Sequence, residues 1–441
     1  MTKKMIILMA AVALQTTVHA GGLMTNTNYH VAFDRMMARG ASTEIDAAYS
    51  NPAGLVWGYD GLQLSLDFQK PWQYRDIEWN GTTYEGKASA PIVPALFASY
   101  KKDRWAVSSM IGIVGSGGFV EYKQGVPMFN VLMTSLLAGN GITPDTYTLD
   151  SEMKGKQYIY GGQLNFSYKL TDCLSAAAGL RANYYDGYYR GHVIAHDHPQ
   201  LGKLASLLLD VDQKGWGFTP LVSVNFHQGP LTVTARYEFR TKIETENETN
   251  VLDAGLGQNV IAAMMATDPV GAQAKLAALS GQLGNYTAAY QDGAKTRYDM
   301  PALLSVAAGY EITPKLRATA EFHFFDDKHA KMAGDRQKEL THGTYEYLLG
   351  AEYDINDKFT VSLGGQRTDY GLSEGYQQDT SFACDSYSVG LGGAWNITDK
   401  IRLNAGYFVT LYSDYKKNNS YGEETYSRTN NVIGAGIDFK F

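Results

Sequence analysis

Residues 401–412 read IRLNAGYFVTLY, and residues 433–441 read IGAGIDFKF. In both stretches the odd positions are apolar, and most residues between them are polar or glycine. A β-strand places alternate residues on opposite faces, so this period of two predicts strands with one apolar face. The same alternation recurs at residues 231–240 and 316–324. The chain is therefore expected to form many half-apolar strands.

Short polar connections recur between strand-like segments of about ten residues each. They are Lys101–Asp103, Thr171–Asp172, Gln228–Gly229, Thr313–Pro314, Asn356–Asp357 and Thr398–Asp399. Longer irregular connections lie between these hairpins, notably 115–155, 188–214 and 244–295. Short turns at one end and long loops at the other are typical of outer-membrane barrels. Six hairpins, with one strand before them and one after, predict an all-β fold, namely a 14-stranded antiparallel transmembrane β-barrel over residues 59–441.

Residues 1–20 have the features of an export signal. Lys3 and Lys4 precede an apolar stretch, and the segment ends in Val18-His19-Ala20, which suits cleavage after Ala20. No later run of 18 apolar residues could form a membrane-spanning helix. The net charge of −7 argues against a nucleic-acid partner. Together with the strand pattern, these features predict a location in the bacterial outer membrane.

Residues 21–58 precede the first strand and lack the period of two. They are rich in small residues and contain Asn51, Pro52, Ala53 and Gly54. Asn before Pro favours a tight turn, and small residues allow backbones to approach closely. We therefore expect this segment to pack as a plug, or hatch, inside the barrel.

The stretch from Arg35 to Thr43, with the pattern R-x-x-x-R-G-A-S-T, and the Asn51–Gly54 motif resemble the hatch of the FadL/TodX family. Members of this family are outer-membrane transporters for long-chain fatty acids and aromatic hydrocarbons. The resemblance implies a 14-stranded barrel with an N-terminal hatch, which agrees with the strand count. It also implies a route: capture in an apolar groove of extracellular loops, a pocket above the hatch, and sideways exit at a kink in the third strand.

Three segments of the predicted loops carry apolar, helix-like runs, namely 128–138, 201–209 and 260–279. Exposed apolar surface of this kind indicates a binding groove, or loop helices that cap each other over the pore. The candidate groove residues are Phe129, Leu132, Leu136, Leu204, Leu208, Met264 and Met265.

The third predicted strand ends in a glycine cluster at Gly112, Gly115, Gly117 and Gly118. Glycine within a strand permits a bulge or bend and leaves no side chain to block an opening. The cluster is therefore a candidate lateral gate, with a flexible strand end as the alternative. Its late position in the strand departs from a kink at mid-membrane.

Inward positions of the predicted strands carry arginines among acidic residues. Arg236 and Arg317 are candidates to receive the carboxylate of a fatty acid through charge-assisted hydrogen bonds, although pairing with lumenal acids would account for them equally. His192, His196 and His198 form a metal-like cluster, but a solvated loop is the more ordinary explanation. We predict no metal and no cofactor.

Catalytic signatures are absent from the sequence: it contains no G-x-S-x-G elbow, no Walker loop and no H-E-x-x-H motif. His323 with Ser305 or Asp326 is an imaginable acid–base arrangement, but chain position does not show that these residues meet. The protein is therefore not expected to be an enzyme.

The sequence predicts passive uptake of hydrophobic small molecules, with long-chain fatty acids as the leading class. The alternatives are an aromatic-hydrocarbon channel, an open porin for polar solutes, and a surface adhesin or receptor. The expected partners are hydrophobic or detergent-like ligands, outer-membrane lipids, and the barrel-assembly machinery through Phe441. A monomer is expected, because a plug and a lateral gap need one chain only.

Overall fold

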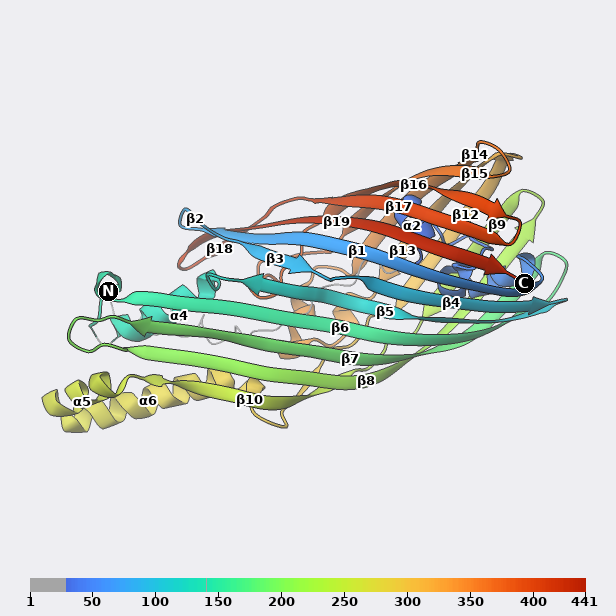
Figure 1. Ribbon diagram of the computed structural model, residues 1–441. Coiled ribbons are helices and arrows are strands. Elements are labelled where there is room, and N and C mark those ends of the chain that lie inside the picture. Colours follow the sequence, from blue (N-terminus) through green and yellow to red (C-terminus); the bar gives the residue numbers. More distant parts are fainter. Residues whose placement is uncertain (1–28, 140) are drawn as a thin grey trace.

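The structure, a computed structural model, describes residues 29–139 and 141–441. They form a closed 14-stranded antiparallel β-barrel (Figure 1), so the predicted fold class is confirmed. The barrel closes where the first strand pairs with the last, from Gln63 and Lys440 to Trp79 and Glu424. The predicted signal peptide lies outside the described residues.

The strands and helices have the following bounds. The strands are β1 (Gly61–Trp79), β2 (Thr82–Tyr84), β3 (Gly86–Ser89), β4 (Val93–Lys102), β5 (Trp105–Tyr122), β6 (Thr148–Lys169), β7 (Leu174–His196), β8 (Ala205–Gln228), β9 (Leu231–Glu238), β10 (Glu244–Leu256), β11 (Lys295–Arg297), β12 (Leu303–Thr313), β13 (Leu316–Phe325), β14 (Thr344–Asp354), β15 (Phe359–Asp369), β16 (Ser386–Thr398), β17 (Ile401–Tyr412), β18 (Tyr415–Asn419) and β19 (Gly422–Lys440). The helices are α2 (Val31–Arg35), α3 (Ala47–Ser50), η1 (Pro52–Trp57), α4 (Pro127–Ala138), η2 (Pro144–Thr146), α5 (Gln258–Thr267), α6 (Pro269–Thr287), η3 (Ala288–Tyr290), η4 (Asp327–His329) and η5 (Ala333–Glu339).

Four of the wall strands are interrupted along their length. β2, β3 and β4 follow one another in a single wall strand, as do β9 with β10, β11 with β12, and β17 with β18. These interruptions reconcile the 14 strands of the wall with the larger number of separate segments.

The alternation predicted from the sequence appears as a barrel with a polar inside and an apolar outside. On β6, Gln163, Asn165 and Ser167 are buried, whereas the intervening Leu164 and Phe166 are 61% and 53% exposed. This reverses the rule for soluble proteins, in which large apolar side chains are buried. The arrangement suits a wall whose outer face meets lipid.

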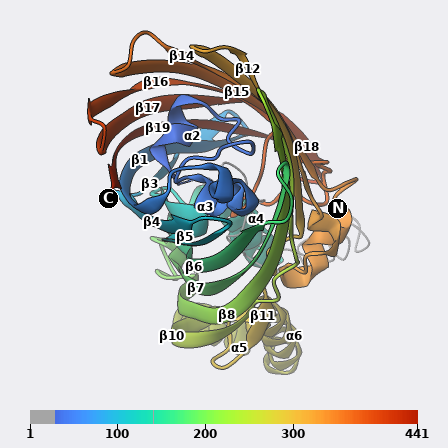
Figure 2. The ribbon, with the colours of Figure 1, turned by 90° about the vertical axis from the view of Figure 1, so that its right-hand side faces the viewer.

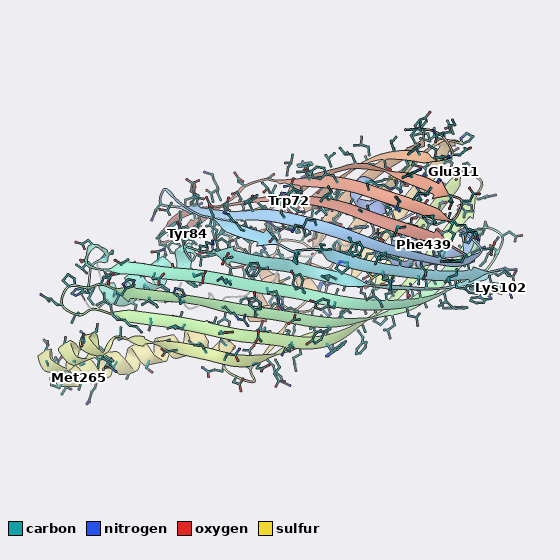
Figure 3. All side chains as sticks on the ribbon, viewed as in Figure 1. Trp72, Tyr84, Lys102, Met265, Glu311 and Phe439 are labelled. Carbon is teal, nitrogen blue, oxygen red and sulfur yellow. The ribbon has the colours of Figure 1, made fainter. Side chains whose placement is uncertain are left out.

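The two ends of the barrel differ. Lys102 and Glu311 lie at the end with the short turns, and Met265, on α5, lies beyond the opposite end (Figure 3). β6, β7 and β8 are the longest strands, with 22, 23 and 24 residues, and they extend well past the strands of the other side (Figure 1). We call the two ends the short-turn end and the loop end.

The predicted long loops are partly wrong, because strands continue into them. Most of the predicted loop 188–214 belongs to β7 and β8, and β6 and β10 occupy parts of the other two loops. A strand above the lipid needs hydrogen bonds to its neighbours but no apolar face. The sequence signal of alternation therefore ends before the strand does.

The N-terminal segment lies inside the barrel, where α2 and α3 are enclosed by the wall (Figure 2). Val31, Met37 and Ala48 are inaccessible to solvent. Among the described residues, no helix has the length and apolar character that crossing a membrane requires. Both cysteines, Cys173 and Cys384, are free thiols.

Candidate functional site

The first plug helix rests on glycines of the inner wall. A Cβ atom at Gly390 would lie 2.5 Å from the carbonyl oxygen of Asp34, and one at Gly406 would lie 2.8 Å from the backbone nitrogen of Arg35. Any larger residue at these positions would collide with the plug backbone. Glycine at these two wall positions therefore allows the plug backbone to approach the wall closely.

The Glu352 carboxylate, on β14, holds the plug through arginines. It pairs with Arg35 and, at 3.2 Å, with Arg39, both from the plug, and at 2.9 Å with Arg317 of β13. Arg39 also pairs with Asp46 of the plug at 2.7 Å. Buried charges are costly unless they are paired, so this network fixes the orientation of the plug against the wall.

Replacing Glu352 by Gln is expected to loosen the plug. Arg35 and Arg39 would lose a buried carboxylate, and breaking a buried ion pair costs about 3–5 kcal/mol. Limited proteolysis should then cut the plug faster while the barrel stays intact. Asp354→Asn is the matched control, because Asp354 is 32% exposed and its partners Arg317 and Thr360 both belong to the wall and not to the plug. Equal protection of the plug in the wild type and Glu352→Gln would contradict this role.

The short-turn end of the lumen is lined by charged residues. Glu44 pairs with Arg402 at 2.6 Å and with Arg39 at 2.8 Å. Burial would raise the pKa of Glu44, but Arg402 and Arg39 outweigh burial and hold this pKa well below its ordinary value. A cavity of about 630 Å³ opens beside these residues and is also lined by Arg317 and Asp354. Its charged lining does not suit a hydrophobic ligand.

The Asn51–Gly54 motif lies at the contact between plug and wall. The Asn51 amide donates to the Ser42 carbonyl at 3.0 Å and to the Asn225 side chain at 2.9 Å. The Ala53 backbone N–H donates to Ser223 Oγ at 3.0 Å. A Cβ atom at Gly54 would lie 2.3 Å from the Asn51 amide nitrogen. The Pro52 carbonyl oxygen accepts a hydrogen bond from Ser167 Oγ of the wall at 2.7 Å.

One group of described residues has the composition of a metal site. The side-chain atoms of His30, Asp67 and Asp438 lie within 4.8 Å of one another. His30 Nδ1, however, accepts the Ala32 backbone N–H, so its proton lies on Nε2, which faces the carboxylates. Ser65 Oγ lies 2.7 Å from an oxygen of each carboxylate. Hydrogen bonds therefore satisfy the polar atoms of these three side chains. The group attaches the start of α2 to β1 and β19.

The histidines near residue 196 are not brought together as a site. His192 pairs with Asp150 at 3.4 Å, and His196 pairs with Asp197 at 2.9 Å. His198 Nδ1 accepts the backbone N–H of Leu201. Each histidine thus has a local partner of its own, but His192 and His196 lie on β7 and not in a loop as expected, and only His198 lies in the turn after it.

The glycine cluster of β5 coincides with a break in the wall. The ladder between β4 and β5 ends at Leu96 and Ile111, and the ladder between β3 and β5 begins only at Ser89 and Phe119. The described residues between these pairs lie outside both ladders. We call the segments 90–95 and 112–117 the wall break.

Two irregularities of β5 accompany the wall break. The register with β6 shifts between Ile113 and Gly115 and again between Ser116 and Gly118. Gly118 has a φ of +71°, in the left-handed region that favours glycine. Bulges of this kind bend a strand and interrupt its pairing.

The inner side of the wall break is apolar. Ala90, Val93 and Ile113 pack together, and Tyr29 of the plug and Tyr158 of β6 contact them. A second cluster continues inward, from the wall to the plug. It contains Ile45, Ala47, Ala48, Tyr49, Leu55 and Val56 of the plug, with Ala95, Phe97, Ala106, Met110, Val114, Ile159, Tyr185, Ile243, Tyr298 and Met300. Packed apolar side chains therefore extend from the plug to the break.

Two of the three apolar runs form helices at the loop end, as predicted (Figure 1). The run 128–138 forms α4, and the run 260–279 forms α5 and the start of α6. Phe129, Met133 and Leu137 of α4 pack with Val260 of α5 and with Leu204. The two helices and the adjoining wall therefore share one apolar cluster, which we call the cap cluster.

The expectation of a helix at 201–209 was wrong. This segment forms a turn and then the start of β8, which pairs with β7 on one side and β10 on the other. Leu204, just before β8, is buried in the cap cluster, and Leu208, on β8, is half-buried. Pairing with two neighbouring strands satisfies the backbone here, which a run of leucines alone does not reveal.

The remaining groove candidates lie on the cap helices. Leu136 and Met264 contact the cap cluster, and Leu132 and Met265 are half-buried. The cap residues thus pack on one another and on the wall, while part of their apolar surface stays accessible.

The loop after β13 contains a buried acid that makes it sensitive to pH. Asp327 lies in η4 and accepts the Thr344 backbone N–H at 2.8 Å, and burial raises its pKa from 3.8 to about 7. The stabilisation from the protonated form is complete below pH 3.8 and is lost as the pH rises through 7. Hydrogen exchange of residues 326–343, corrected for intrinsic rates, should therefore accelerate by up to about tenfold per pH unit across this window.

Replacing Asp327 by Asn should remove this pH dependence, because Asn has no proton to lose. Exchange rates that follow the same pH profile in Asp327→Asn and in the wild type would mean that another group is responsible. Asp335→Asn is the control, because Asp335 is exposed and its pKa is lowered by Lys338.

The two predicted carboxylate receptors already have partners. Arg236 donates to the Tyr49 carbonyl at 2.7 Å and pairs with Glu238 at 2.7 Å. Arg317 pairs with Glu352 and Asp354 at the short-turn end. A ligand carboxylate at either site would have to displace these acids.

His323 belongs to a group of paired side chains on the inner wall. It lies between Glu321, at 2.6 Å, and Glu346, at 2.8 Å. The Ser305 hydroxyl donates to the Glu321 carboxylate at 3.1 Å, so its partner is Glu321 and not His323. Glu321 in turn accepts the Gly40 backbone N–H of the plug at 2.7 Å. These groups therefore connect the plug to the wall.

Comparisons with known proteins agree with this architecture. A family model described as an outer membrane protein β-barrel domain matches residues 259–441. No curated protein sequence matches the chain. Among solved structures, a FadL homologue of Pseudomonas aeruginosa is 14% identical, with a TM-score of 0.67, and the match covers 96% of this chain and 100% of that chain.

Two toluene transporters also have similar structures. TodX of P. putida is 13% identical, with a TM-score of 0.59 over 91% of this chain and 95% of its own. TbuX of Ralstonia pickettii is 14% identical, with a TM-score of 0.55 over 94% of this chain and 99% of its own. The resemblance seen in the hatch motif thus extends to the fold of the whole described chain. The protein is an outer-membrane β-barrel with the FadL/TodX fold.

Proposed function

We propose that this protein is a passive outer-membrane channel through which hydrophobic small molecules, and long-chain fatty acids in particular, enter the cell and leave the barrel sideways. The observation that carries the proposal is the wall break beside an apolar interior. A ligand that avoids water can pass from the cap cluster, along the inner apolar cluster, to lipid without crossing the charged short-turn end.

The position of the break supports sideways exit. Ala90, Val93 and Ile113 present apolar side chains at the point where β4 and β5 are not paired. A neighbouring residue, Ile92, is 57% exposed, which suits contact with lipid. Gly112 and Gly115 add no side chain beyond a hydrogen atom. An opening at this point would break no ladder pairing between β4 and β5.

The plug supports selection against polar solutes. It is attached to the wall by Glu352, by the Asn51–Gly54 motif and by the group around His30. These contacts come from opposite sides of the wall and close the straight path to the short-turn end. A continuous water-filled pore, as in a porin, is therefore not the path that this arrangement favours.

The substrate class is tested by uptake into cells. We expect cells that lack their own fatty-acid transporter to accumulate labelled oleate when they express this protein, and to gain no uptake of labelled toluene. A gain for toluene alone would assign the protein to the hydrocarbon class, as with the toluene transporters TodX and TbuX. No gain for either compound would overturn the proposed function.

A further inference from the structure

Two arginines face each other inside the barrel where its first and last strands meet. Arg75 of β1 and Arg428 of β19 are direct partners in the ladder. Both lie at inward positions, since the adjoining inward residues Ile77, Tyr426 and Asn430 are buried. Directly opposed residues have Cβ atoms about 4.5–5.5 Å apart, and like charges in that position destabilise a sheet.

Neither arginine has an acidic partner among the residues that the structure describes. Arg75 donates to the Phe382 carbonyl at 2.9 Å, and its Nε atom is buried with no hydrogen-bond partner. Arg428 Nε is likewise buried with no such partner, and its guanidinium lies over the Tyr412 ring at 4.6 Å. The titratable groups that act on both arginines are Tyr122, Tyr412 and Cys384, and none of them is a carboxylic acid.

Four buried arginines at the contact of plug and wall or on the inner wall are treated differently. Arg35, Arg39, Arg181 and Arg236 each pair with a carboxylate. Buried charges are normally paired in this way, because an unpaired charge loses its hydration without compensation. A pair of cations with no anion is therefore a site that an anionic ligand would complete.

The surroundings of the pair indicate what kind of anion would fit. Phe382 and Cys384, on the loop before β16, and Tyr122 of β5 belong to the cap cluster, together with Phe129 and Met133 of α4. The Arg75 guanidinium lies over the Phe382 ring at 5.2 Å. The two guanidinium groups thus adjoin the apolar residues of the cap cluster, where the Tyr426 hydroxyl binds Asp379 and Glu424.

A third cation flanks the same loop. Arg336, in η5, donates to the carbonyl oxygen of Ser381 at 2.6 Å and lies over the Tyr376 ring at 4.0 Å. Its Nε atom is also buried with no hydrogen-bond partner. The loop that carries Phe382 is therefore approached by positive charge from two sides.

We propose that Arg75 and Arg428 bind the anionic head group of an amphiphile whose hydrocarbon chain lies against the cap cluster. Guanidinium groups match a carboxylate with paired N–H donors, and such charge-assisted hydrogen bonds are stronger than neutral ones. The arginine pair makes the channel selective for acids over neutral hydrocarbons. This assignment rests on the proposed function, and it names the residues that would choose among hydrophobic ligands.

The test compares binding of oleate with binding of methyl oleate, its neutral ester, to the purified full chain in a non-ionic detergent. The wild type should bind oleate about 10- to 100-fold more tightly than the ester. Arg75→Gln and Arg428→Gln should each lose most of this preference while binding methyl oleate as the wild type does. Arg75→Lys, which keeps the charge, should retain part of it.

Arg104→Gln is the matched control, because Arg104 is exposed at a short turn and donates to backbone carbonyls there. It should bind both ligands as the wild type does. Equal binding of oleate and ester by the wild type, or an unchanged preference in both glutamine variants, would overturn the arginine site and leave the proposed function standing. Failure of the wild type to bind either ligand would instead overturn the proposed function.

Discussion

Deleting residues 21–58 is expected to convert a nearly silent barrel into an open pore. The described part of this segment fills the lumen, and its removal leaves a 14-stranded wall around polar inward side chains. In planar bilayers we expect the steady single-channel current to rise by about tenfold or more, because wide barrels without a plug hold a continuous water column. A deletion variant with the conductance of the wild type would mean that the segment does not close the lumen.

A single substitution offers a second way to move the plug. Leu at Gly406 would collide with the backbone of Asp34 and Arg35, because even a Cβ atom there would lie 2.8 Å from the Arg35 nitrogen. Gly406→Leu should therefore raise conductance in the same direction as the deletion. Gly162→Leu is the control, since a Cβ atom at Gly162 meets no atom within 4 Å and the residue is exposed on the outer face. Equal conductance in the two variants would contradict the seating of α2 on this glycine.

Fastening the wall break with a disulfide is expected to stop uptake, and reduction is expected to restore it. A Cβ atom at Gly112 would lie 3.4 Å from Ala95 Cβ, close to the separation of about 3.5–4.5 Å that a disulfide requires. Ala95→Cys with Gly112→Cys, in a background of Cys173→Ser and Cys384→Ser, would join β4 and β5 at the edge of the break. Oleate uptake should fall to less than about a tenth of the parent rate if exit through the break limits transport.

The single variants Ala95→Cys and Gly112→Cys are the controls, and both should transport with or without reductant. Full uptake by the oxidised double variant, with the disulfide verified by mass spectrometry, would show that ligands leave elsewhere. Loss of uptake that reductant does not reverse would point to damage of the fold and not to closure of the break.

Most of the fold could be predicted from the sequence because the barrel repeats one signal. Each strand within the membrane needs alternate apolar residues, so stretches such as 401–412 reveal both the strand and its two faces. The extensions of β7 and β8 could not be read in this way, because above the lipid their outward residues include Arg190 and Asp212. There the strand depends on its neighbours and not on its own apolar pattern.

The candidate site was predicted less completely. The hatch motif and the glycines of β5 were found because turns and bulges restrict residue type. Arg236 and Arg317 were chosen by charge alone, and their acidic partners, Glu238 and Glu352, become evident only when the register is known. Arg75 and Arg428 are absent from the sequence-based candidates, because the strand pattern does not show which residues face each other where the barrel closes.

Photo-crosslinking tests the central claim, that hydrophobic ligands leave through the wall break, most directly. A fatty acid with a diazirine on its chain would be bound to the full protein in membranes, irradiated, and its attachment sites mapped by mass spectrometry. We expect labels at Ala90, Val93 and Ile113, together with labels in the cap cluster. Labels confined to the cap cluster and the short-turn cavity, around Arg317 and Arg402, would contradict sideways exit and indicate passage along the barrel axis.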